Sequence, residues 1–133
     1  MEKPIKEMAM VFNGVGLAIF WLGPNGSSEG AIADSNVLWH RIWTARDELG
    51  GIAHSHPWNG PANASHTDVT TFAAIERGLG KRLIWPIVTM THVNFFAWDE
   101  KEKQYLDVMQ VDFRDTEQWH NAVKTLRQLS TGG

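Results

Sequence analysis

The chain of 133 residues contains no cysteine. This absence excludes disulfide bonds and thiolate zinc sites, so histidine and carboxylate side chains are the remaining candidates for holding a transition metal. The sequence also lacks an apolar run of about 18 residues, the length of a membrane-spanning helix, and shows no signal-peptide pattern at its start. We therefore expect a cytoplasmic protein that does not enter a membrane.

Positive charge is also scarce. The chain has 12 Lys and Arg against 15 Asp and Glu, which gives a net charge of −3 and a pI near 6.0. Binding to nucleic-acid backbones or anionic lipid surfaces depends on clustered Lys and Arg, so we expect neither as a partner. An apolar content of 43% in a chain of this length supports one buried core, and we expect a single domain over residues 1–133.

The most informative stretch holds two histidines one residue apart, His54 and His56, directly before Pro57. A short apolar segment precedes them and is typical of a buried strand, on which side chains two residues apart share one face. Pro57 ends this strand because it cannot donate a ladder hydrogen bond. Further along, Ser65 is a suitable helix N-cap, which places Asp68 in the first helical turn. The spacing predicts that both histidines and Asp68 converge.

Two histidines and one aspartate form a set of three metal ligands. Structural zinc sites use four protein ligands, whereas catalytic sites use three and leave the fourth position to water. Zinc lowers the pKa of such a water to about 7, which makes it a nucleophile at neutral pH. We therefore expect a catalytic Zn²⁺ site at His54, His56 and Asp68, and the sequence leaves open whether another divalent ion replaces zinc.

The pattern H-x-H-P followed by S-x-x-D, read from His54 to Asp68, resembles the signature of the JAMM metallopeptidases, also called the MPN+ or JAB family. The resemblance implies that His54, His56 and Asp68 bind zinc and that Ser65 stabilises the tetrahedral intermediate. The chain departs from the family pattern, because seven residues separate Pro57 from Ser65 where six are expected. Its short length is similar to that of compact prokaryotic and phage-type members.

The same resemblance implies an upstream glutamate that acts as general base. Glu7 is the first candidate, because residues 7–14 loosely match the E-x-x-G-x-L-x-G strand pattern of the family, with Met10 in place of the first glycine. Glu29 is the second candidate, and a solvated charge at a strand end is the competing interpretation of Glu7. Trp58, which follows the histidine motif, is either a wall of the substrate groove or an anchor of its loop.

The order of apolar segments and turn residues predicts an α/β (α+β) domain with one central mixed, curved sheet flanked by helices. The resemblance implies the JAB/MPN-like, cytidine deaminase-like version of this fold over about residues 5–110. Asn13-Gly14 predicts a hairpin turn, and Pro86 within a β-rich segment predicts an edge strand or a bulge. The expected helices cover residues 36–49 and 66–79 and a segment after a cap at 115 or 116, and further strands are expected at 93–99 and 105–111.

These observations favour a zinc-dependent metallopeptidase. The resemblance implies cleavage of a peptide or isopeptide bond. The expected substrate is a protein or peptide, such as the tail of a ubiquitin-like or sulfur-carrier protein, cleaved after its C-terminal glycine. Two alternatives stay open at this point. One is a catalytically inactive MPN-like scaffold or binding module, and the other is a RadC-like protein of DNA metabolism, against which the acidic charge balance argues. The sequence gives no indication of the oligomeric state.

Overall fold

A computed structural model describes residues 7–22 and 36–131 of the chain. This part forms one six-stranded sheet in the order β2-β1-β3-β4-β5-β6. Strands β3 and β4 are parallel, and the other neighbouring pairs are antiparallel. In chain order the elements are β1 (Ala9–Asn13), β2 (Ala18–Leu22), α1 (Asn36–Thr44), β3 (Leu49–Ser55), α2 (His66–Leu79), β4 (Trp85–Val88), β5 (Val93–Asp99), β6 (Gln104–Asp107) and α3 (Glu117–Ser130). The expectation of a mixed sheet flanked by helices is confirmed.

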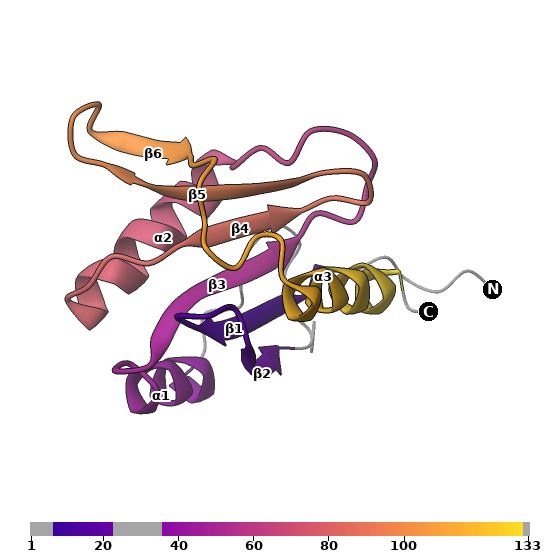
Figure 1. Cartoon of the computed structure of the whole chain (residues 1–133). Coiled ribbons are helices and arrows are strands. Elements are labelled where there is room, and N and C mark those ends of the chain that lie inside the picture. Colours follow the sequence, from indigo (N-terminus) through magenta and orange to yellow (C-terminus); the bar gives the residue numbers. More distant parts are fainter. Residues whose placement is uncertain (1–6, 23–35, 132–133) are drawn as a thin grey trace.

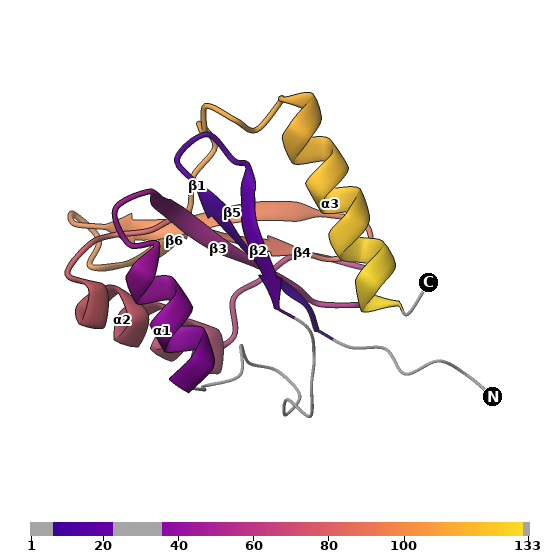
Figure 2. The ribbon, with the colours of Figure 1, turned by 90° about the horizontal axis from the view of Figure 1, so that it is seen from below.

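The sheet has helices on both faces: α1 and α2 cover one, and α3 covers the other (Figures 1 and 2). Each face has its own apolar core, because successive strand residues point to opposite sides. The core under α1 and α2 contains Val11 and Ile52, and the core under α3 contains Met10 and Ala53. Residues 52, 54 and 56 therefore share the face of α1 and α2. None of the helices in the described ranges combines the length and apolarity needed to cross a bilayer.

The predicted hairpin at Asn13 is present as the connection between β1 and β2. The side-chain oxygen of Asn13 accepts hydrogen bonds from the backbone N–H groups of Val15 and Leu17, both at 3.1 Å. Gly16 adopts a φ of 82°, a left-handed conformation that favours glycine. The hairpin makes β1 an interior strand between β2 and β3.

The first helix is shorter at its C-terminal end than the sequence predicts. It was expected over residues 36–49 with Gly50 and Gly51 as its stop, but α1 ends at Thr44 and both glycines lie inside β3. The glycines are needed for close approach rather than for capping. A Cβ atom on Gly51 would lie 2.0 Å from the carbonyl oxygen of Ile84, and one on Gly50 would lie 2.5 Å from that of Asn13.

The prediction for Pro86 is also wrong. Its strand, β4, lies between β3 and β5, and its pairing with β5 runs without a register shift. Ile84 donates to the Gly50 carbonyl, so the next donor to β3 in a parallel ladder would be residue 86. Proline has no N–H, and beyond it the ladder continues with His54 paired to Ile87 and Ser55 paired to Val88. The sheet therefore accepts one missing bond in its interior.

The remaining predicted elements agree more closely with the structure. Helix α2 begins after Ser65 and ends at Gly80, whose φ is 71°, as the sequence predicts. Strand β5 is confirmed, and Thr116 rather than Asp115 caps α3. Strand β6 ends at Asp107, four residues short of the predicted end at 111.

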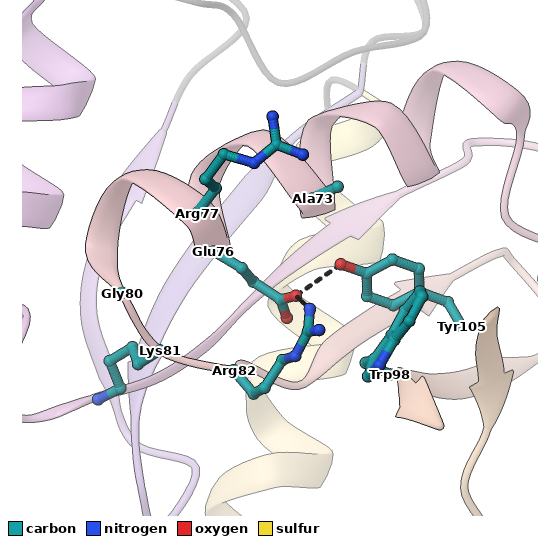
Figure 3. A pocket seen from close by; sticks show the side chains of 8 residues that line it. All are labelled: Ala73, Glu76, Arg77, Gly80, Lys81, Arg82, Trp98 and Tyr105. Carbon is teal, nitrogen blue, oxygen red and sulfur yellow. Dashed lines mark hydrogen bonds and ion pairs between the residues drawn. The ribbon is translucent and has the colours of Figure 1, made fainter. Parts of the chain in front are cut away.

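A buried carboxylate, Glu76, ties the end of α2 to the sheet and lines a pocket of about 510 Å³ (Figure 3). It accepts hydrogen bonds from the Arg82 guanidinium, the Leu83 N–H, the Trp85 indole and the Tyr105 hydroxyl. Burial and this neighbouring carboxylate raise the pKa of Tyr105 above its ordinary value, which keeps the phenol as a donor. Glu76 is thus fully used in holding the fold.

We predict that Glu76→Gln lowers the free energy of unfolding by roughly 2–3 kcal/mol, because an amide nitrogen would face buried donors. The midpoint of urea unfolding measures this change. Arg82→Gln is the matched control and should have a much smaller effect, since the Arg82 side chain is 55% exposed. Equal losses in the two variants would contradict the central role of the carboxylate.

Candidate metal centre

The end of β3 carries His54 and His56, which are only 2% and 6% exposed. Their Nε2 atoms lie 3.1 Å apart, since residues two apart on a strand point to the same side. The Nδ1 atom of His54 is buried and makes no hydrogen bond within the described ranges, so packing and the contacts of Nε2 orient this ring. Phe72 of α2 lies against it, with ring centroids 6.1 Å apart.

Asp68 approaches both histidines from α2. One carboxylate oxygen lies 3.2 Å from Nε2 of His54, and the other lies 3.2 Å from Nε2 of His56. The three side chains therefore converge, despite the extra residue in the loop before Ser65. Which ion they hold, and whether they hold one, stays a prediction from the sequence.

The position of Asp68 is fixed by a capping box at the start of α2. The Ser65 hydroxyl accepts from the Asp68 N–H at 3.0 Å, and the Asp68 carboxylate accepts from the Ser65 N–H at 3.0 Å. Burial raises the pKa of Asp68, but hydrogen bonds with His54 and His56 and the bond from Ser65 lower it by more. The pKa of this carboxyl consequently lies well below its ordinary value, and the group is ionised at neutral pH.

Glu7 completes the cluster from the segment just before β1. Its Oε1 atom lies 3.6 Å from Nε2 of His56, and its side chain is 14% exposed. Strand β1 pairs with β3 so that Ala9 lies opposite His54. Glu7, two residues before Ala9, therefore lies beside the histidines, and ligand atoms of Glu7, His54 and His56 all lie within 4.8 Å of one another.

These donors fit a zinc ion in type and in spacing. Zinc binds imidazole nitrogen and carboxylate oxygen at about 2.0–2.2 Å, which places neighbouring ligands of a tetrahedral site about 3.3 Å apart. The Nε2 atoms of His54 and His56 lie 3.1 Å apart, and each lies 3.2 Å from a different oxygen of the Asp68 carboxylate. Such a group of nitrogen and oxygen donors, buried and pointing at one another, is the arrangement expected around a cation.

Trp58 forms a wall beside the cluster. Its ring stacks on the His56 ring with centroids 4.7 Å apart, and 53% of the residue is exposed. The loop that carries it is held by Met90, whose N–H donates to the Trp58 carbonyl at 2.9 Å. Both earlier interpretations are thus compatible with the structure, because the ring is anchored on one side and accessible on the other.

The second base candidate and two further histidines near the motif complete the survey of possible donors. Glu29 lies outside the described residues, so the structure does not compare it with Glu7 as a general base. His66 follows the cap and is exposed, and His92 pairs with the Thr91 hydroxyl rather than with the cluster. The sequence did not reveal the role of Glu76, although its position four residues after Phe72 places it on the buried face of α2.

No protein-family model matches the chain, and no curated protein matches it. The JAMM resemblance therefore remains an inference from the residues between His54 and Asp68. The geometry of the cluster is therefore the basis for inferring a function.

We predict that the purified chain, loaded with zinc and passed through gel filtration, retains a stoichiometric amount of zinc in elemental analysis. His56→Ala should reduce this to background, because two remaining protein ligands hold the ion too weakly. His66→Ala is the control, since this exposed histidine begins α2, ten residues after His56, and lies outside the cluster. Unchanged zinc in the His56→Ala variant would overturn the ligand assignment.

Proposed function

We propose that the protein is a zinc-dependent metallopeptidase or isopeptidase of the JAMM type, with the JAB-like version of its mixed fold. One observation carries the proposal: a fourth side chain, the carboxylate of Glu7, lies 3.6 Å from His56 at the edge of the His54–His56–Asp68 cluster. Three ligands with a carboxylate beside them are what metal-assisted hydrolysis requires.

His54, His56 and Asp68 would hold the zinc ion in this proposal. Zinc, when bound, supplies a Lewis acid that activates water and polarises the scissile carbonyl. The Asp68 carboxylate suits a ligand because it is ionised and its direction is fixed by the Ser65 N–H. The low exposure of all three residues keeps bulk water away from the charged groups and strengthens their electrostatic effect.

Glu7 is the proposed general base. A carboxylate at this position takes a proton from the attacking water and delivers it to the leaving amine. The Glu7 side chain is 14% exposed, more than those of the histidines and Asp68, so it lies nearest to solvent among the four. Ser65 is the proposed oxyanion donor: its oxygen accepts from the Asp68 N–H, and a hydroxyl that accepts one bond still has its own proton to donate.

The proposed substrate is a protein or peptide with an extended segment, such as the C-terminal glycine tail of a ubiquitin-like or sulfur-carrier protein. The exposed face of the Trp58 ring, stacked on His56, offers an apolar surface beside the reacting bond. An extended tail also has the option of pairing with an edge strand of the sheet. In the described sheet the two edges are β2 and β6.

The position of Glu7 favours a hydrolase over an inactive MPN-like scaffold, for which no acidic group near the histidines is required. A RadC-like role in DNA metabolism has no comparable support, because the net charge is −3.

We predict that Glu7→Gln lowers kcat by about 10²–10⁴-fold while the zinc content stays unchanged, because the amide cannot accept a proton. The assay follows cleavage of peptides that end in Gly-Gly and are joined to a fluorogenic amine or, through an isopeptide bond, to lysine. Glu48→Gln serves as the control, since this residue lies on the turn before β3 and contributes nothing to the cluster.

Two results would contradict the proposal. One is a zinc-loaded wild-type protein that cleaves none of these peptides in a zinc-dependent manner. The other is a Glu7→Gln variant with wild-type kcat, which would remove Glu7 from the reaction.

A further inference from the structure

The residue between the two histidines, Ser55, points to the opposite face of the sheet. It is 1% exposed and lies on the α3 side, because side chains alternate along β3. Its hydroxyl accepts a hydrogen bond from the Met8 N–H at 2.8 Å, and its own N–H donates to the Met8 carbonyl at 2.9 Å. Ser55 therefore binds both backbone polar groups of the residue that follows Glu7.

A second buried hydroxyl meets Ser55 from α3. Ser130, in the last turn of that helix, is fully buried and shares a hydrogen bond with the Ser55 hydroxyl. Ser130 also donates to the Leu126 carbonyl at 2.7 Å. A chain of hydrogen bonds thus runs from the Met8 backbone through Ser55 and Ser130 into α3, joining residues far apart in the sequence.

This chain bears on the position of Glu7. Met8 faces α3 and belongs to its apolar core, so Glu7 points to the other side, towards the histidines. Met8 lies just before the first residue of β1, where ladder pairing gives less restraint than inside the strand. The direction of the Glu7 carboxylate consequently depends on how firmly the Met8 backbone is held.

We propose that Ser130, acting through Ser55, is a positioning residue for Glu7. The two hydroxyls hold the Met8 backbone from the α3 face, and this keeps the carboxylate on the opposite face aimed at the metal cluster. Helix α3 takes no part in the cluster itself. The inference rests on the proposed function, since it assigns a purpose to the placement of the general base.

The geometry distinguishes this role from general packing. Each buried hydroxyl has another partner, the Met8 N–H for Ser55 and the Leu126 carbonyl for Ser130, and the bond between the two hydroxyls adds to these where water does not reach. Removing the Ser130 hydroxyl leaves its volume nearly unchanged but takes away a partner of the Ser55 hydroxyl. Ser55 is then able to rotate towards another acceptor, and the bond from the Met8 N–H is weakened. His54 remains held by the β3 ladder, and His56 by the bond from its N–H to the Val88 carbonyl.

Amide hydrogen exchange tests the structural step directly in the full chain. In Ser130→Ala, the Met8 amide should exchange at least tenfold faster, whereas the Met10 amide of the same strand should keep its wild-type rate. Thr131→Ala, in the same helical turn, is the control and should change neither rate. Wild-type exchange at Met8 in the Ser130→Ala variant would overturn the inference.

Kinetics test the step to Glu7, with the fluorogenic Gly-Gly peptides as probe. Ser130→Ala should lower kcat about tenfold, with KM and zinc content unchanged. In a Glu7→Gln background the same substitution should have no further effect on the residual kcat, since the group it positions is absent. An equal tenfold loss in that background would indicate a general structural effect and overturn the role.

The outcomes also separate this inference from the proposed function. If Glu7→Gln abolishes most of the activity and Ser130→Ala has the wild-type kcat, only the positioning role is overturned. If the zinc-loaded wild type has no zinc-dependent activity, the proposed function fails and the positioning role fails with it.

Discussion

The carboxylate of Asp68 is the group on which the site depends. It completes the capping box at the start of α2 and at the same time lies 3.2 Å from each of the two histidines of β3. The hydrogen bonds that begin the helix therefore also aim the carboxylate. A buried anion of this kind is stable only with compensating partners, which the two imidazoles, the Ser65 N–H and, in our proposal, a cation provide.

The sheet places the candidate site and the buried serine pair on opposite faces. Glu7, His54 and Asp68 lie on the face of α1 and α2, whereas Ser55 and Ser130 lie on the face of α3. The alternation of side chains along β3 produces this division, since neighbouring residues must point to opposite sides. A rigid interior strand is a suitable base for a site that tolerates little displacement of its ligands.

Local rules predicted the parts of the fold that local interactions determine. The sequence predicted the alternation of side chains on β3, the cap at Ser65 and the end of α2 at Gly80. The first two of these placed His54 and Asp68 in one cluster. The sequence did not predict that Gly50 lies inside a strand, where it is needed because the backbone of Asn13 on β1 comes too close for a side chain. Pro86 was misplaced for a similar reason: a strand's position in the sheet is set by pairing with distant segments.

The same distinction holds within the candidate site. The sequence alone did not show that Glu7 lies beside His56, because this follows from the pairing of β1 with β3. The Ser55–Ser130 contact was not predicted either, since it joins two elements that share no motif. X-ray absorption at the zinc edge tests the central claim most directly. In the zinc-loaded protein our account predicts scattering from two imidazole rings with the remaining ligands oxygen. A spectrum with one imidazole or none would contradict it.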